Sequence, residues 1–140
     1  MTKLKWWFLI VGVWYLFLGL ANTGATLFDP QLSMYKGLLP GPLAGNALAA
    51  RGFADAWFAF VMDMLAIGGF CLWASRDPLK YLGAVWIIVL MEFLHGVVDD
   101  AFLIARGYDA MSYIIFIVIH FVIIVTGVMF VREASAKTSS

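Results

Sequence analysis

Residues 81–105 read YLGAVWIIVLMEFLHGVVDDAFLIA, an apolar stretch whose second half contains acidic and histidine side chains. The stretch is long enough to form a helix through a hydrocarbon core of about 30 Å. Its polar residues include Glu92, His95, Asp99 and Asp100, and it contains no lysine or arginine. A charge in the bilayer interior costs several kcal/mol, so such residues usually pair with one another, face a cavity or take part in chemistry.

The composition of the chain is that of an integral membrane protein. Of its 140 residues, 64% are hydrophobic and only 13% are charged, whereas a soluble domain is about half apolar and about a quarter charged. The formal net charge is zero and there is no block of basic residues, which argues against nucleic-acid binding. The single cysteine, Cys71, excludes an intramolecular disulfide.

Four apolar segments predict four transmembrane helices, at about residues 6–28, 53–75, 81–105 and 111–131. Helices are expected because membrane-spanning strands alternate apolar and polar residues, and these segments do not. The second and third connections are short turns, which make neighbouring helices antiparallel. The predicted fold is therefore all-α, with residues 1–140 forming a single transmembrane domain, an up-down four-helix bundle.

The first connection, residues 29–51, is predicted to be an external capping loop, because it combines prolines and glycines with several leucines. Lysine and arginine favour the cytoplasmic side of a membrane. Six of them lie on the side of the two termini and three lie on the other side. The first group is Lys3, Lys5, Arg76, Lys80, Arg132 and Lys137, and the second is Lys36, Arg51 and Arg106. We therefore expect both termini in the cytoplasm.

The polar residues of the four segments are predicted to converge. At 100° per residue, Glu92, His95 and Asp99 fall on one face of the third segment. The corresponding faces of the other segments carry Asn22, Asp55, Asp63 and His120. The helical rise places these groups in the middle and outer half of the bundle, beneath the capping loop. The sequence thus predicts an outward-biased pocket of carboxylates and histidines, which must hold protons, a metal cation or a cationic ligand.

The leading hypothesis is that this pocket binds a lipophilic small molecule that arrives from the lipid bilayer. A carboxylic acid in an apolar pocket can deliver a proton and a neutral histidine can accept one, so acid–base chemistry would follow from Glu92, His95 and Asp63 as catalytic residues. The residues predicted to line the binding site are Asp99, His120, Asn22, Asp55, Trp57, Trp86 and Phe116. The sequence leaves open whether the protein is an enzyme, and this hypothesis requires no cofactor.

Two alternatives stay open. Glu92 and His95 form a Glu-x-x-His pair of the kind that binds metals in helical bundles, so Glu92, His95, His120 and Asp63 could hold a transition metal. His95 and His120 are also predicted at similar depths, which would suit haem ligation by two histidines. The second alternative is non-enzymatic: an accessory subunit of a membrane enzyme, or a proton-coupled carrier. A carrier of this size would be expected to form a homo-oligomer.

The first segment opens with Lys3-Leu4-Lys5-Trp6-Trp7-Phe8-Leu9-Ile10-Val11-Gly12-Val13, followed by Tyr15, Leu18, Gly19 and Asn22. With the length and four-span layout of the chain, this opening resembles small bacterial membrane proteins of the BphX-like kind, which are grouped with DoxX-like proteins. Such proteins are found alongside aromatic-degradation enzymes. The resemblance implies a bacterial inner membrane and a role near the metabolism of hydrophobic compounds, and it implies no catalytic residues.

Overall fold

The computed structural model describes residues 2–138, which form long helices with short helical segments between them. The elements in chain order are α1 (Lys3–Phe28), α2 (Ser33–Leu38), α3 (Gly41–Ala44), α4 (Ala47–Ala74), η1 (Pro78–Tyr81), α5 (Leu82–Met91), η2 (Glu92–Val98), α6 (Asp99–Ala105) and α7 (Ala110–Thr138). The segment η1 is a 3₁₀ helix and η2 is a π-helix, and together with α5 and α6 they form one continuous third helix. The described residues contain no strand, which confirms the all-α prediction.

Four helices are long and apolar enough to cross a membrane, as the sequence predicts. These helices are Lys3–Phe28, Ala47–Ala74, Pro78–Ala105 and Ala110–Ala136. The second helix begins at Ala47, several residues before the predicted start near residue 53. Its start is set by Asn46, whose side chain accepts hydrogen bonds from the backbone N–H groups of Leu48 (2.9 Å) and Ala49 (3.1 Å).

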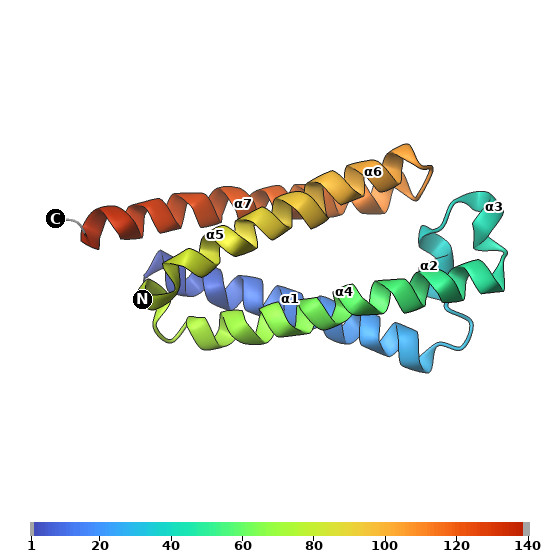
Figure 1. Ribbon diagram of the computed structural model, residues 1–140, viewed down its shortest axis with the longest axis horizontal. Coiled ribbons are helices and arrows are strands. Elements are labelled where there is room, and N and C mark those ends of the chain that lie inside the picture. Colours follow the sequence, from blue (N-terminus) through green and yellow to red (C-terminus); the bar gives the residue numbers. More distant parts are fainter. Residues whose placement is uncertain (1, 139–140) are drawn as a thin grey trace.

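The long helices pair as two antiparallel hairpins. Figure 1 shows α1 beside α4, and α7 beside α5 and α6, with both termini at one end and α2 and α3 at the other. Contacts between α1 and α7 join the hairpins. Within residues 2–138, α4 does not pack along α5, η2 or α6. One side of the bundle is therefore held together less closely than the others.

Glycines allow the backbones of α1 and α4 to meet, as small residues commonly do in membrane bundles. A Cβ atom added to Gly68 would lie 2.9 Å from the backbone nitrogen of Leu16 and 3.0 Å from the carbonyl oxygen of Gly12. A Cβ atom added to Gly12 would in turn lie 3.1 Å from the carbonyl oxygen of Gly68. The close approach of the two helices therefore requires glycine at both positions.

The half of the bundle near the termini has a solid apolar core. Side chains from α1, α4, α5 and α7 form it, and its buried members are Leu4, Trp7, Phe8, Val11, Cys71, Ala74, Val85, Ile88, Ile123 and Val131. Trp7 satisfies its indole N–H by donating to the carbonyl oxygen of Ile123 over 3.2 Å. At the adjacent end, Lys3 forms an exposed salt bridge of 2.9 Å with Glu133. The polar residues of the third helix lie in the other half of the bundle.

The connection between α1 and α4 covers the opposite end of the bundle, and we call residues 29–46 the cap. Its centre is Tyr35, which is fully buried and shares a 2.6 Å hydrogen bond with the hydroxyl of Thr26. The backbone N–H of Asp109 donates to the carbonyl oxygen of Leu38, which ties the cap to the turn before α7. Asp29 accepts from the backbone N–H of Ser33 (2.7 Å), and this bond lowers the pKa of the Asp29 carboxyl. The segment predicted as a capping loop is thus an ordered structure.

Alanine at Gly68 is expected to destabilise the bundle by about 1–3 kcal/mol, because the new methyl group would meet backbone atoms that cannot move aside. Gly69→Ala is the matched control, since a Cβ atom there has nothing within 4 Å and alanine favours a helix over glycine. Denaturant titration of both variants in detergent, followed by tryptophan fluorescence, measures the difference. Equal stability of the two variants would contradict the close backbone contact.

Candidate functional site

A cavity of about 280 Å³ lies between the two hairpins, in the half of the bundle beneath the cap. All four long helices line it, and Met34 and Leu38 of α2 close its outer end. Its polar and ionisable lining consists of Tyr15, Asn22, Asp63, Glu92, His95, Asp99, Asp100, Ser112, Tyr113 and His120. Its aromatic walls are Trp14, Trp57, Phe60 and Phe116. Of the polar residues predicted to converge, the cavity lining includes all except Asp55: Asn22, Asp63, Glu92, His95, Asp99 and His120.

Glu92 is the centre of a hydrogen-bonded group that joins three helices. The residue is 1% exposed. Its Oε1 accepts a 2.6 Å hydrogen bond from the hydroxyl of Tyr15 on α1. Its Oε2 shares a 2.5 Å hydrogen bond with Nδ1 of His120 on α7. Both carboxylate oxygens are thus partnered, and the His120 ring is held with its Nε2 atom directed away from Glu92.

Asp100 lies beside the second ring nitrogen of His120, and Tyr113 lines the same cavity. The Nε2 atom of His120 lies 3.7 Å from Oδ2 of Asp100, within ion-pair range but beyond a hydrogen bond. Asp100 is 5% exposed and Tyr113 is 3% exposed. Asp100 Oδ2 and the Tyr113 hydroxyl have no hydrogen-bond partner among residues 2–138. Because buried polar atoms are nearly always partnered, these two are the atoms of the cavity lining with hydrogen-bonding capacity left unused by the described residues.

The π-helical segment η2 determines which residues of the third helix face inward. Its wider turn brings Glu92, Gly96 and Asp100 to the buried face, while His95 is exposed and Asp99 is half-buried. A Cβ atom on Gly96 would overlap the imidazole ring of His120, so glycine is required for that ring to reach Glu92. Single π turns in helices often occur at functional sites.

The cavity lies beside α4 and the third helix, which do not pack along each other. Asp63 of α4 and His95 of η2 are exposed and line the cavity from these two helices, and we call this side of the cavity the lateral mouth. The ring of Phe60 contacts that of His95 edge-on, with centroids 5.3 Å apart. No residue of 2–138 forms a hydrogen bond or ion pair with the Asp63 carboxylate.

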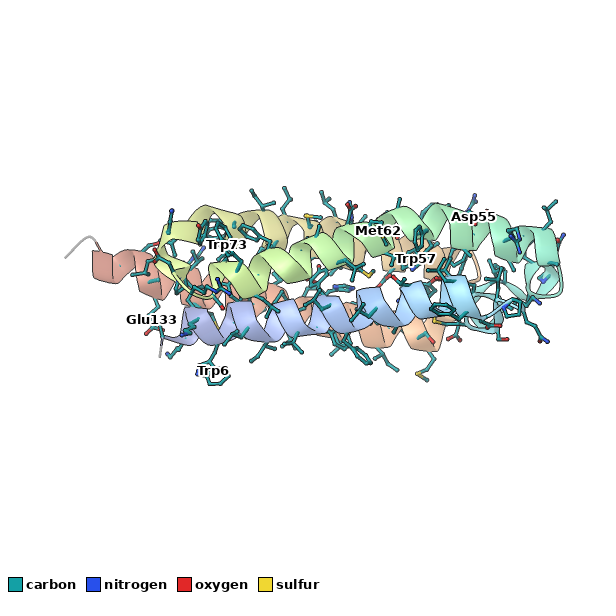
Figure 2. The ribbon with its side chains drawn as sticks, turned by 90° about the horizontal axis from the view of Figure 1, so that it is seen from below. Trp6, Asp55, Trp57, Met62, Trp73 and Glu133 are labelled. Carbon is teal, nitrogen blue, oxygen red and sulfur yellow. The ribbon has the colours of Figure 1, made fainter. Side chains whose placement is uncertain are left out.

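The remaining predicted binding residues divide into two groups. Asn22, Trp57 and Phe116 line the cavity, and the indole N–H of Trp57 donates to the side-chain oxygen of Asn22 over 3.1 Å. Asp55 and Trp86 lie outside the cavity lining. Figure 2 shows Asp55 and Trp57 on opposite sides of α4, toward the end of the helix away from Trp73.

Sequence reasoning did not name Tyr15, Asp100 or Tyr113 as site residues. The signal for Tyr15 was its position on the small-residue face of the first segment, near Gly12 and Gly19. For Asp100 the signal was its spacing of eight residues from Glu92, which an α-helix leaves about 80° apart and a wider turn brings closer to alignment. Standard helical steps instead pair Glu92 with His95, whereas its partner in the structure is His120.

The side chains that could bind a metal do not lie together in the described part of the chain. Residues 2–138 contain no group of three or more histidine, cysteine, aspartate or glutamate side chains arranged to hold a metal ion. His120 uses Nδ1 for Glu92, and His95 lies at the lateral mouth beside Phe60. The transition-metal and haem alternatives therefore stay predictions from the sequence.

Comparison with known proteins identifies the family. The sequence profile of the BphX-like family matches residues 1–137. The chain belongs to the BphX-like family. A relative from Burkholderia cepacia and another from Paraburkholderia xenovorans, both named only as uncharacterized BphX-like proteins, are each 26% identical to this chain over 140 residues, covering 99% of it and 97% of the relative. No solved structure matches the chain. This is a BphX-like protein of membrane type with a buried Glu–His pair.

Removing the Tyr15 hydroxyl is expected to destabilise the protein by about 1–3 kcal/mol, because one oxygen of a buried carboxylate would lose its partner. Tyr113→Phe is the matched control, since the hydroxyl of Tyr113 has no hydrogen-bond partner among the described residues. Its removal should leave stability within about 0.5 kcal/mol of the original protein. Thermal unfolding of Tyr15→Phe and Tyr113→Phe in the same detergent compares them, and a larger loss for Tyr113→Phe would contradict the assignment.

Proposed function

We propose that this protein binds a lipophilic small molecule in the cavity beneath the cap and exchanges a proton with it through His120. The observation that carries the proposal is the Glu92–His120 pair: a carboxylate that is 1% exposed orients a histidine, and the histidine lines an aromatic-walled cavity. Sites for small molecules are typically apolar pockets with a few convergent polar groups. The BphX-like family and the four helices that are apolar enough to cross a membrane support a site that lies within a membrane protein.

The ligand would reach the cavity from the lipid bilayer. The lateral mouth between α4 and the third helix supports this route, because it faces outward from the bundle within the apolar helices. The opposite half of the bundle is filled by the apolar core around Phe8 and Val85, and the outer end is covered by the cap around Tyr35. A lipophilic molecule partitions into the bilayer, so a sideways opening suits it better than an aqueous one.

In the proposed chemistry, His120 is the acid–base residue and Glu92 is its positioning residue. The bond between Glu92 and Nδ1 holds the imidazole ring in place and stabilises its protonated form, as a carboxylate does for the histidine of a catalytic triad. The Nε2 atom would take a proton from the bound molecule and return it. The sequence placed this role on His95 with Glu92 and Asp63, and the contact between Glu92 and His120 favours His120 instead.

The proposed location is the inner membrane of a bacterium, with both termini in the cytoplasm. The charge pattern supports this orientation, because Lys3 begins α1, Arg76 lies in the turn after α4, and Arg132 lies in the part of α7 that leads to the C-terminus. In this orientation the cavity occupies the outer half of the bilayer and the cap faces the periplasm.

Filling the cavity is expected to remove a co-purified ligand. Ala21 lines the cavity and is exposed, so Ala21→Phe should occupy ligand space without disturbing the core. Ala56→Phe is the matched control, because Ala56 is exposed on α4 outside the lining. Organic extracts of the protein and both variants, purified in the same detergent, are compared by mass spectrometry. A small molecule retained by Ala56→Phe and lost from Ala21→Phe supports the proposal, and equal retention or absence in all three overturns it.

Proton exchange is tested by incubating the protein and its co-purified molecule in D₂O and measuring deuterium bound to carbon. The expected exchange removes a proton from a carbon beside an electron-withdrawing group, leaves the electron pair on the molecule and returns a deuteron. His120→Gln should slow incorporation by about 100-fold or more, the usual contribution of a general base. His95→Gln is the control, and greater loss in His95→Gln than in His120→Gln would transfer the role to His95.

A further inference from the structure

The cavity contains more acidic groups than its own basic groups can balance. Four carboxyl side chains line it, from Asp63, Glu92, Asp99 and Asp100. None of the lysines or arginines within residues 2–138 belongs to the lining. The only cationic partners available there are two histidines. One of them, His120, lies within 4.0 Å of both Glu92 and Asp100, so a single imidazolium would serve two carboxylates.

Asp63, at the lateral mouth, is an acidic group without a basic partner among the described residues. It lies near the middle of α4, is exposed, and forms no hydrogen bond or ion pair with any residue of the described chain. An unpaired carboxylate at that depth costs several kcal/mol in a bilayer. A cation passing through the mouth would offset this cost, whereas a neutral molecule would not.

Deeper in the cavity, the two unpartnered polar atoms show what the ligand must supply. Asp100 Oδ2 and the Tyr113 hydroxyl oxygen are both buried and can both accept a hydrogen bond. Each belongs to a residue at least nine-tenths buried that lines the cavity. An N–H group that carries positive charge would satisfy these acceptors and place its charge beside Asp100. This requirement is independent of the count of acidic residues.

The apolar walls fit the rest of such a molecule. Trp14, Trp57, Phe60 and Phe116 line the same cavity, and the faces of aromatic rings attract cations. An apolar cavity of about 150 Å³ holds one benzene molecule, so the volume of about 280 Å³ suits a group of about two fused rings.

We infer that the cavity binds a lipophilic amine in its protonated form, with the ammonium group between Asp100 and Tyr113 and the aromatic part against Trp57 and Phe60. The inference rests on the proposed function, which supplies the lipophilic ligand, and it adds that this ligand carries a positive charge. The carboxylate of Asp99 is half-buried and lines the same cavity, so it adds a second negative charge near the ammonium group.

The test compares two probes of nearly identical shape. (Dimethylaminomethyl)naphthalene is protonated at neutral pH, and isobutylnaphthalene has a neutral C–H in place of the N–H⁺. Binding of each is measured by equilibrium dialysis against the protein in phosphatidylcholine nanodiscs, after subtraction of the amount held by empty nanodiscs. We expect the ammonium probe to bind at least about tenfold more tightly, through its one charge-assisted hydrogen bond, its charge and its ring contacts.

The outcomes separate the inference from the proposed function. Equal binding of the two probes, or tighter binding of isobutylnaphthalene, would overturn the inference and leave a lipophilic site in place. Binding of neither probe above the empty nanodiscs would overturn the inference for this cavity. The co-purification comparison of Ala21→Phe with Ala56→Phe would then decide whether the proposed function also fails.

Neutralising an acidic group tests the position of the charge. Asp99→Asn should weaken binding of the ammonium probe at least about fivefold and leave isobutylnaphthalene unchanged, since only the charged probe interacts with a carboxylate. Unchanged binding of the neutral probe also shows that the cavity is intact. Asp77→Asn makes the same chemical change in the exposed turn at the other end of the bundle and should affect neither probe. Equal effects of Asp99→Asn on both probes would contradict the inference.

Discussion

The polar half of this bundle depends on the burial of one carboxylate. Glu92 accepts from Tyr15 and shares a short hydrogen bond with His120, so a single side chain joins α1, the third helix and α7. A membrane interior offers no water to a polar group whose partner is lost. The three helices must therefore keep their relative rotation for Glu92 to remain satisfied. The same constraint fixes where the imidazole of His120 meets the cavity.

The π-helical turn explains how one helix can serve both a buried group and an open mouth. In η2 the chain rotates less per residue than in an α-helix, so Gly96 and Asp100 follow Glu92 along the buried face. His95, only three residues from Glu92, is turned toward the lateral mouth. Gly96 is the small residue that lets the His120 ring approach. The irregular turn is thus part of the site's geometry.

Hydropathy and charge placement were sufficient to predict the four spans, because the cost of exposing polar backbone to lipid leaves helices as the expected solution. The helical rise predicted that Asp63, Glu92 and His120 lie at similar heights in the bundle, and all three line one cavity. The hydrogen-bond partners of Glu92 could not be predicted from these patterns. Regular 100° steps align Glu92 with His95, and a π turn leaves no clear signature in residue types. The partnership of Glu92 with Tyr15 depends on contacts between helices, which no pattern within one helix encodes.

The arrangement of the helices separates the lateral mouth from the hydrogen-bonded group around Glu92. Tyr15, Glu92, Asp100 and His120 come from α1, the third helix and α7, and none of them lies on α4. The second helix is held through its close packing on α1 and through the cap, and at the lateral mouth it meets the third helix by the ring contact of Phe60 with His95. Moving α4 away from the third helix would widen the mouth without breaking any hydrogen bond of the Glu92 group. Under the proposed function, a ligand would therefore pass from the bilayer into the cavity while the geometry of the Glu92–His120 pair stays unchanged.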